Sequence, residues 1–549
     1  MTKYARHVSA LATPQREPAR PEQQMNDAGG YAFVLDLWAR LDRFLILGCE
    51  GGSYYASERA MTRENARVID ECLAANGPRT VAQIVEISAS GRAPKNAPAI
   101  FALAIAAGHP DLATRRAALA AIPRVCRTGT DLFHFTRDVE GFRRWGRGLR
   151  GAIAAWYNDK PIDRLAYQAI KYQSRDGWSH RDLLRLAHPK AKTPEHDALY
   201  RWIVGGTEAL SRVSDKGQPI PEDRLPKAVR AFEVMRGETD RKRIAALVRE
   251  HRFTHEMVLT EHKNDPAIWE ALFEDMPMTA LVRNLGKMTA VGLLAPGSAA
   301  ARKAAARLTD AEHIAAARVH PIALLSALRV YEQGHGERAR QRANALSWKP
   351  AREIVDALDE AFYLAFKSIT PTGKTHLLAL DVSGSMTSGT IAGVPGLTPR
   401  VASAAMALAT AKVERQFLCM SFSAAHGSNA GISPLTISPR QRLDDVLKTV
   451  ESLPFGGTDC SLPMIWAREN EIPVDTFVIY TDNETWAGRM HPFQALAEYR
   501  HKMGRAAKLI VVGMTATSFT IADPSDPGML DVVGFDTAAP QVMADFARG

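Results

Sequence analysis

Apolar residues recur at spacings of three and four from about Tyr31 to Lys367, interrupted by polar residues, Pro or Gly. This periodicity predicts amphipathic helices, because strands would alternate with period two. The clearest predicted helices span residues 32–47, 63–75, 97–107, 112–121, 142–157, 227–235, 240–250, 277–289 and 354–366. About fifteen or more helices with short connections predict stacked antiparallel pairs in a curved or closed array with a concave surface.

The pattern changes after Pro371 and Gly373. A continuous apolar run from His376 to Leu380 ends in Asp381, which is typical of a buried strand. Further strands are predicted over residues 417–422, 476–481 and 508–514, and helices over residues 400–414, 440–452 and 492–503. This alternation predicts a second domain with a doubly wound, mainly parallel α/β sheet, and a boundary near residues 368–374.

Length and composition narrow the class of protein. A chain of 549 residues exceeds one hydrophobic core, and its five cysteines are scattered without a close pair, which fits a reducing compartment. Residues 1–25 are polar and rich in Arg, Gln and Pro, unlike a signal peptide, and no run of about 18 apolar residues occurs. We therefore expect a cytoplasmic protein without a membrane span.

The net charge of +9 is unevenly distributed. Residues 371–549 carry 14 Lys and Arg against 17 Asp and Glu, hence −3, whereas residues 1–370 carry 55 against 43, hence +12. Excess positive charge attracts a phosphate backbone independently of its sequence. The helical domain is therefore the candidate for RNA or DNA binding, although a merely solvated basic surface has the same composition.

Oxygen-bearing side chains follow the predicted strands of the second domain. Asp381, Ser383 and Ser385 alternate directly after the first strand, and Gly384 permits a tight turn between them. Two later loops, at residues 456–459 and 481–483, supply further oxygens. Such loops meet at the carboxyl edge of a parallel sheet, and hard oxygens with few carboxylates suit Mg²⁺.

This arrangement resembles the metal-ion-dependent adhesion site of von Willebrand factor A domains. The matching residues are Asp381, Ser383 and Ser385 in the first loop, Thr458 in the second and Asp482 in the third. The resemblance implies a bound divalent metal, for which Mg²⁺ is the candidate. A carboxylate of a partner protein would complete the coordination of this metal. Ordinary helix caps and turns use the same hydroxyl residues. A hydrolytic metal centre is disfavoured, because no general base stands at a defined spacing.

The densest basic region runs from residue 143 to residue 192, with twelve Lys or Arg against four acids. After Pro161, which can open a helix, one polar stripe is predicted; it comprises Arg164, Gln168, Lys171 and Arg175. Ser179–Asp182 has the sequence of a capping box that starts the next helix. His180 and Arg181 would lie on its first turn and Arg185 one turn later, where a helix N-terminus favours phosphate.

Two further basic clusters are candidates for single-stranded backbone recognition. One contains Arg283 and Lys287, and the other contains Arg92 and Lys95 in a loop. For each cluster, and for the predicted helix at His180, a solvated surface remains the alternative.

Several segments resemble the Ro autoantigen, or TROVE-domain, family of RNA-binding proteins. They are residues 26–31, 43–55, 178–186, 283–289 and 371–374, and the resemblance extends over residues 25–549. It implies a flexible tail over residues 1–24, a HEAT-like ring of helical repeats over residues 25–368, and a von Willebrand factor A domain, Rossmann-like in its doubly wound sheet, over residues 369–549.

The resemblance also implies a function without catalysis. Small noncoding Y-like RNAs would bind the outer surface at Lys171, Arg175, His180, Arg181 and Arg185, and single-stranded 3′ ends of misfolded RNAs would enter the hole near Arg283 and Lys287. Bacterial members are associated with polynucleotide phosphorylase, so the expected role of this monomeric ring is RNA quality control within a ribonucleoprotein. The alternatives are a helical protein-interaction scaffold and, less favoured, a Mg²⁺-dependent hydrolase.

Overall fold

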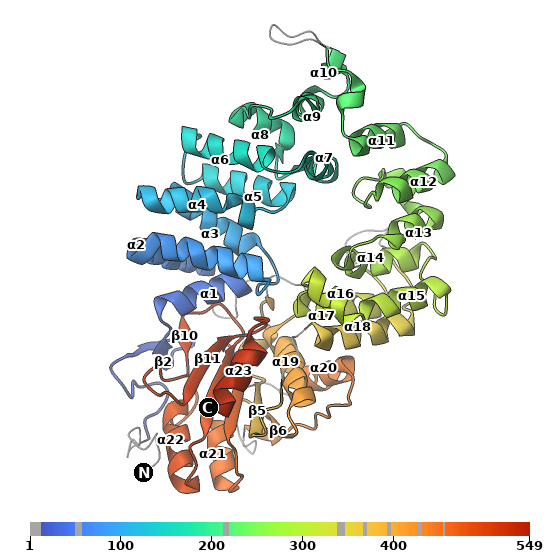
Figure 1. Cartoon of the computed structure of the whole chain (residues 1–549). Coiled ribbons are helices and arrows are strands. Elements are labelled where there is room, and N and C mark those ends of the chain that lie inside the picture. The colour runs from blue at the N-terminus through green and yellow to red at the C-terminus, as the bar shows by residue number, and fades with distance from the viewer. Residues whose placement is uncertain are drawn as a thin grey trace.

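The computed structural model describes residues 12–49, 58–211, 219–336, 346–365, 370–391, 397–424, 431–453 and 456–549. Its helices form a ring of two arms that stands on an α/β domain (Figure 1). The fold class predicted from the sequence is confirmed.

The first arm rises from the α/β domain, and the second descends back to it (Figure 1). The first arm contains α1 (Leu37–Leu47), α2 (Glu58–Ser90), α3 (Ala97–Gly108), α4 (Leu112–Val125), α5 (Gly129–Glu140), α6 (Arg147–Asn158), α7 (Ile162–Lys171), the hairpin β3 (Ser174–Arg175) and β4 (Trp178–Ser179), and α8 (His180–Ala187). The connection and second arm contain α9 (Pro194–Gly205), α10 (Glu208–Ser211), the 3-10 turns η2 (Glu222–Arg224) and η3 (Thr260–Asn264), α11 (Lys227–Arg236), α12 (Arg241–His251), α13 (Pro266–Glu274), α14 (Met278–Ala290), α15 (Ala299–Leu308), α16 (Ala311–Ala317), α17 (Pro321–Glu332) and α18 (Arg352–Leu364).

Local sequence signals set many of these helix ends. α5 begins after a capping box formed by Thr128 and Asp131, and α8 begins after the predicted capping box of Ser179 and Asp182. α2 is broken at Asn76, whose backbone is not helical, two residues before Pro78. α3 is almost wholly apolar and packs against α1, α2, α4 and α5, so this arm has a continuous core.

The C-terminal domain has a six-stranded sheet with strand order β11-β9-β8-β5-β6-β7. Its strands are β5 (Thr375–Asp381), β6 (Gln416–Phe422), β7 (Ile432–Pro434), β8 (Thr476–Thr481), β9 (Lys508–Gly513) and β11 (Met529–Val533). All neighbours pair in parallel except β6 and β7. The helical elements are the 3-10 turn η5 (Gly384–Thr387), α19 (Pro399–Val413), α20 (Leu443–Glu451), α21 (Leu462–Glu469), α22 (Pro492–Met503) and α23 (Ala539–Arg548). The four strands predicted from sequence are confirmed to within one residue.

Alternate residues of each central strand enter different cores. Leu378 and Leu380 of β5 belong to an apolar cluster that continues through α19 and α20 into the helical ring. Leu377 and Ala379 belong to a second cluster with α21 and α22. Because both faces of the sheet are covered, its strands are apolar without alternation. One face of the sheet therefore shares a continuous apolar core with the helical ring.

The N-terminal segment departs from two predictions. Residues 32–34 were expected in a helix, but they belong to β2 (Tyr31–Val34), which pairs with β1 (Gln23–Met25) and with β10 (Phe519–Thr520). Helix α1 starts only at Leu37, because Asp36 caps it through the amides of Trp38 and Ala39. The sequence also predicts a flexible tail over residues 1–24, whereas residues 12–24 pack on the α/β domain.

Gln15 shows why this segment is ordered. Its side chain is fully buried; the amide nitrogen donates to Asp459 Oδ1 (2.9 Å) and to the carbonyl of Met490 (2.8 Å). Its amide oxygen accepts from Thr485 Oγ1 (2.6 Å) and from the backbone amide of Gly488 (3.1 Å). All four hydrogen-bonding positions of the Gln15 amide are satisfied, so the segment is an integral part of the domain.

Candidate nucleic-acid interface and metal centre

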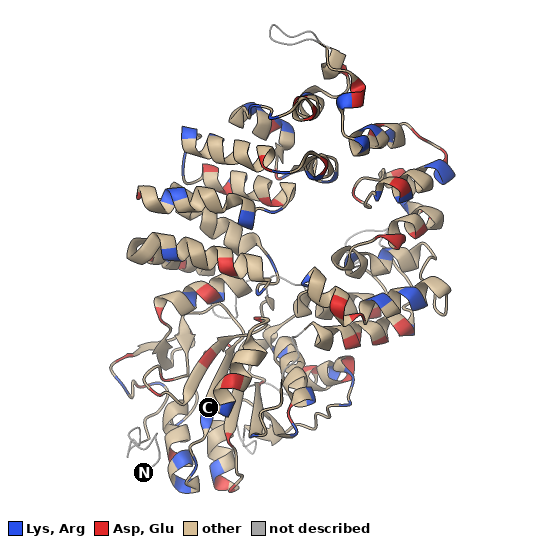
Figure 2. Cartoon of the chain, viewed as in Figure 1, with Lys and Arg blue, Asp and Glu red and all other residues tan. Residues whose placement is uncertain are grey.

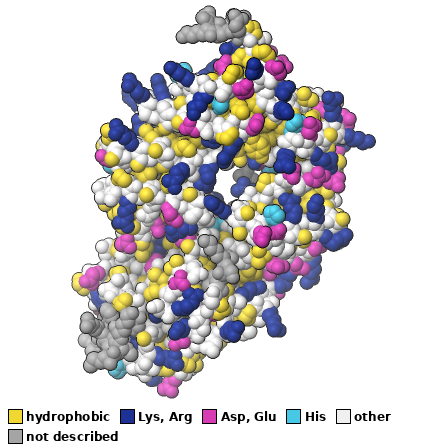
Figure 3. All heavy atoms as spheres, in the orientation of Figure 1, with side chains coloured by type: hydrophobic (Ala, Val, Ile, Leu, Met, Phe, Trp, Pro, Cys, Tyr) yellow, Lys and Arg dark blue, Asp and Glu magenta, His cyan; other side chains and the backbone are white. Residues whose placement is uncertain are grey.

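A basic cavity of about 790 Å³ lies between the two arms near the base of the ring. Its wall comes from the α2–α3 loop, α14, the α16–α17 region and Trp348. The cationic residues in the wall are Lys95, Arg127, Arg283, Lys287 and Arg318. Figure 3 shows the surface hollowed between the arms, with Lys and Arg side chains around the hollow. The two basic clusters singled out in the sequence, almost 190 residues apart, therefore meet at one cavity.

Neutral groups hold several cations of this cavity. No Asp or Glu of the described ranges lines the cavity. Lys287 Nζ donates to Asn264 Oδ1 at 2.7 Å, and partial burial lowers the pKa of Lys287. Arg127 donates to the carbonyl and the hydroxyl of Ser88 (3.0 and 2.9 Å). These neutral partners orient the cations and leave their charge available to an anionic ligand.

Trp348 adds an aromatic wall. Its indole Nε1 donates to the carbonyl of Tyr331 (2.9 Å), and the two rings stack with centroids 6.1 Å apart. The indole abuts Gly286 of α14 so closely that a Cβ there would lie 2.7 Å from the ring. Cations beside an aromatic side chain are the usual means of holding a single nucleic-acid strand. Trp348, Arg127 and Arg318 were missed in the sequence because each stands alone there.

A second basic surface lies on the outside of the first arm at α8. Arg181 and Arg185 are exposed and one turn apart, and Arg175 in the β3–β4 hairpin is 62% exposed. Lys171 is only 13% exposed; its Nζ lies 3.8 Å from Glu256 Oε1 and over the rings of Tyr167 and Tyr172. Three of the predicted outer residues are thus accessible, and Lys171 is largely enclosed. Figure 2 shows Lys and Arg scattered over the helices of this arm.

His180 does not lie on this outer surface. Its side chain is 2% exposed, and Nδ1 is 2.7 Å from the hydroxyl of Tyr157. Burial lowers the pKa of His180 to about 4, so the ring is neutral at pH 7. Gln168 is also buried and accepts a hydrogen bond from the Gly129 amide (2.8 Å), which interrupts the predicted polar stripe. The first-turn position of α8 faces the core because α8 packs against α6, where the His180 ring contacts the rings of Trp156 and Tyr157.

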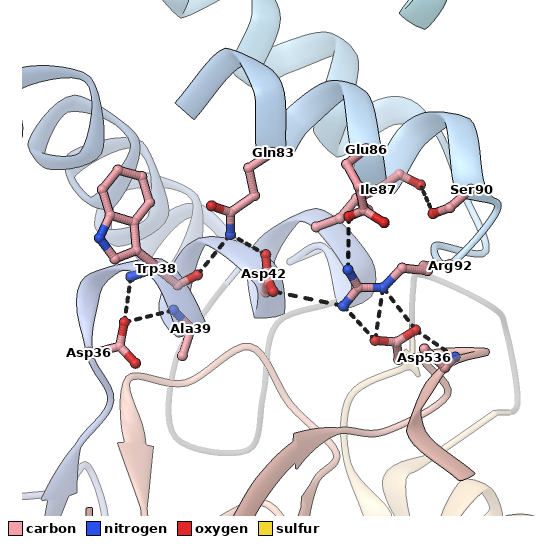
Figure 4. Close-up of polar contacts among 11 residues, drawn as sticks. Asp36, Trp38, Ala39, Asp42, Gln83, Glu86, Ile87, Ser90, Arg92 and Asp536 are labelled. Carbon is pink, nitrogen blue, oxygen red and sulfur yellow. Dashed lines mark hydrogen bonds and ion pairs between the residues drawn. The ribbon is translucent and has the colours of Figure 1, made fainter. Parts of the chain in front are cut away.

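Arg92 likewise does not line the cavity, contrary to the sequence prediction. Its guanidinium turns toward the α/β domain and forms ion pairs with Asp536, Glu86 and Asp42 (Figure 4). The next residues of the same loop, Ala93 to Asn96, do line the cavity. Because three carboxylates surround Arg92, its charge is compensated within the protein.

The five predicted metal ligands lie together at the carboxyl edge of the sheet. Asp381, Ser383, Ser385, Thr458 and Asp482 are all buried, with at most 4% exposed. Ser383 Oγ is 3.1 Å from Ser385 Oγ, and Asp381 accepts hydrogen bonds from the amide of Ser383 (2.9 Å) and from Thr481 Oγ1 (2.7 Å). The amide of Gly384 also donates to the carbonyl of Gly456 (3.0 Å), so the structure brings the three loops together.

The chemistry of this cluster fits a cation. Burial and the charge of Asp482 raise the pKa of Asp381 to about 7, and burial also raises the pKa of Asp482. The hydroxyl of Thr458 is buried without a hydrogen-bond partner. A divalent ion would satisfy this oxygen and offset both carboxylates. No group of three or more His, Cys, Asp or Glu in the described parts of the chain could hold a metal, so a cation here would depend on hydroxyl oxygens.

No single helix of the described ranges is both long enough and apolar enough to cross a membrane. The helices α16 and α17 reach that length and apolarity only together, and they are bent by 114° relative to each other.

Comparisons with known proteins match both parts of the chain. The TROVE domain family model matches residues 24–231 and 247–329, and the Ro60 vWA domain model matches residues 375–547. The chain is 43% identical to RNA-binding protein RO60 of Deinococcus radiodurans, over 100% of both chains. It is 37% identical to RNA-binding protein RO60 of Caenorhabditis elegans, over 97% of this chain and 91% of the relative. The crystal structure of the Deinococcus radiodurans RO (RSR) protein superposes with a TM-score of 0.68 at 42% identity and covers 94% of this chain and 100% of its own.

Proposed function

Because the chain belongs to the Ro60 family of TROVE-domain proteins, we propose that it binds RNA at two surfaces of the ring. The cavity between the arms takes single-stranded 3′ ends of misfolded RNAs. The outer surface at Arg175, Arg181 and Arg185 takes the stem of a small Y-like noncoding RNA. The observation that carries this proposal is the gathering of cations from both arms at one cavity, where Arg127, Lys287 and Arg318 bind neutral partners, beside Trp348.

The dimensions of the cavity support a single strand. At about 790 Å³ it is in the size range of small-ligand pockets, which suits a few nucleotides of one strand better than a duplex. Its cations come from both arms, with Lys95 and Arg127 on the first and Arg283, Lys287 and Arg318 on the second. A strand that enters would be held from both sides, and an aromatic side chain can stack on any base.

The wider role that we propose is RNA quality control by a monomeric ring within a ribonucleoprotein. In this role the protein presents RNA to an exoribonuclease, polynucleotide phosphorylase being the candidate, and performs no catalysis itself. A single chain closes the ring, which supports the monomer (Figure 1). None of the five cysteines, all of which lie in the described ranges, forms a disulfide, and this supports a reducing cytoplasm.

We also propose that Asp381, Ser383, Ser385, Thr458 and Asp482 hold Mg²⁺. A bound Mg²⁺ would keep open positions for water and for a carboxylate from a protein partner. The unpartnered hydroxyl of Thr458 and the two buried carboxylates support this assignment.

The test is fluorescence anisotropy with a labelled RNA hairpin, with and without a single-stranded 3′ tail, at several salt concentrations. Replacing Lys95, Arg283 and Lys287 together by Gln should weaken binding of the tailed RNA by at least about tenfold. It should also lower the slope of log affinity against log salt by roughly 0.7 for each lost contact to a single strand. The pair Arg181→Gln and Arg185→Gln should instead weaken binding of the blunt hairpin.

A matched control removes three cations far from both surfaces, at Arg468, Lys502 and Arg505 of the α/β domain. This control changes the net charge equally and should leave both affinities within about twofold. If the wild-type protein ignored both RNAs in dilute buffer and was purified without absorbance at 260 nm, the protein-interaction scaffold would replace this proposal.

A further inference from the structure

The loop that joins α2 to α3 is shared between the cavity and the α/β domain. Ala93, Pro94, Lys95 and Asn96 line the cavity, while Arg92 is not among the lining residues and its side chain points toward Asp536 (Figure 4). The loop is six residues long, from Gly91 to Asn96, so the position of Arg92 constrains that of Lys95. What holds Arg92 therefore influences one wall of the cavity.

Asp536 of the α/β domain holds Arg92 through two nitrogens. Arg92 Nε lies 3.2 and 3.1 Å from the two carboxylate oxygens, and Nη2 lies 2.8 Å from Oδ2. Glu86 accepts from Nη1 at 2.9 Å, and Asp42 lies 3.8 Å from Nη2. Arg92 is 23% exposed and Asp536 only 8%, so water screens this pair weakly. A paired guanidinium with several carboxylates is fixed in direction as well as in place.

The backbone of the loop is held by the second arm of the ring. His320, just before α17, donates from Nε2 to the carbonyl of Arg92 at 3.1 Å, because its Nδ1 accepts from the amide of Ile322 (3.2 Å). Arg318 donates to the carbonyl of Ala89. The two arms and the α/β domain thus meet at this loop.

Asp536 is itself fixed by the sheet. It lies in the turn between β11 and α23, and its Oδ1 accepts from the amide of Ala538 (2.9 Å). The preceding Phe535 is fully buried and has a left-handed backbone (φ 61°). A side chain held in this way can act as a rigid anchor for a partner across the domain boundary.

We propose that Asp536 is a positioning residue for RNA in the cavity, acting through Arg92 on the loop that presents Lys95 and Asn96. This inference rests on the proposed single-strand function of the cavity. The α/β domain would then help to set the affinity for RNA although it does not touch the strand. Loss of the anchor lets the loop relax and removes Lys95 from its place in the wall.

The sign of the effect separates positioning from simple electrostatics. Asp536→Asn removes a negative charge and leaves Arg92 with two of its three carboxylates, and both changes alone would strengthen attraction to RNA. Positioning predicts the opposite, weaker binding. The substitution keeps the turn, because the Asn side-chain oxygen can still accept from the amide of Ala538.

The experiment measures anisotropy with a ten-nucleotide single-stranded RNA and with a blunt hairpin, using the full chain. Asp536→Asn should weaken single-strand binding by roughly tenfold and leave hairpin binding unchanged. Asp531→Asn is the matched control, because Asp531 pairs with Arg43 across the same two domains (2.6 Å) but away from the cavity loop. Both variants are expected to melt at a lower temperature, while only Asp536→Asn should lose single-strand affinity.

A double-mutant cycle completes the test. Arg92→Gln alone should weaken single-strand binding about as much as Asp536→Asn, and the double variant should lose little more, because the pair acts as one unit. Unchanged or tighter binding by Asp536→Asn, or an equal loss in Asp531→Asn, would overturn the inference. Failure of the proposed function is a different result, namely a wild-type protein that does not bind the single strand.

Discussion

His180 and His320 are neutral rings enclosed by the protein and used as hydrogen-bonding groups. His180 contacts the hydroxyl of Tyr157 (2.7 Å), and His320 contacts the carbonyl of Arg92 (3.1 Å). Burial lowers the pKa of each to about 4. A histidine in a basic sequence segment is therefore no sign of phosphate contact here. Its neighbours Arg181 and Arg185 keep the exposure that RNA binding requires.

Because these two rings are buried and neutral, the free energy of unfolding should fall as the pH is lowered. The unfolded chain binds a proton at each His near pH 6.5, but the folded chain does so only near pH 4, so each contribution is complete above about pH 6.5 and is lost toward pH 4. When the pH falls from 7 to 5, the contribution of each ring should lower the free energy of unfolding by about 2 kcal/mol. Urea unfolding at both pH values should show a smaller pH difference for His180→Leu than for the wild type.

His188, exposed at the end of α8, provides the control for that measurement. His188→Gln should keep the wild-type pH difference. His180→Leu should also leave RNA affinity unchanged at pH 7. A pH difference that His180→Leu does not reduce would mean that this ring is protonated in the folded protein.

At the scale of elements, three strand-end loops form the proposed metal centre. Adding Mg²⁺ should raise the melting temperature of the wild-type protein, because an ion that binds only the folded state stabilises it by mass action. Asp482→Asn should abolish this rise, since it removes one of the two carboxylates. Calorimetric scans with and without Mg²⁺ measure the effect.

Ser388, just after the first loop and outside the predicted ligand set, supplies a hydroxyl control. Ser388→Ala should respond to Mg²⁺ as the wild type does, whereas Ser385→Ala should respond less. An equal rise in melting temperature for Asp482→Asn and the wild type would contradict Mg²⁺ binding at this site.

The strands and the cavity differ in how far the sequence predicts them. β5 and β8 were predicted to within one residue because both faces are buried, so their apolar runs are continuous. β2 and β10 were missed because each is short and the two strands, which pair with each other, are nearly 490 residues apart in the chain.

Among the cavity residues, Lys95, Arg283 and Lys287 stand in basic clusters that are visible in the sequence. Arg127 and Arg318 are single cations whose meeting depends on ring closure, which local pattern does not encode; the RNA contacts of all five remain predictions.

At the scale of the whole molecule, the N-terminal segment is structurally part of the C-terminal domain. Gln15→Ala should lower the unfolding free energy by about 2–4 kcal/mol, because Asp459, Thr485 and Gly488 would lose buried partners. Hydrogen exchange should rise in residues 456–490 and change little in α3 to α6. Gln24→Ala, an exposed residue of β1, is the matched control. Faster exchange throughout the ring in Gln15→Ala would instead show that the two parts unfold together.

The pairing of the first strands with the last part of the chain bears on how the protein is made. Gln15 and Thr485 are 470 residues apart, so a ribosome would need roughly half a minute to a minute and a half to supply the second after the first. During that interval the emerging amino end lacks its partners in the α/β domain, while the helices behind it can already stack on their neighbours. Release from the ribosome, rather than synthesis of any one segment, would then be the moment at which the base of the ring is completed.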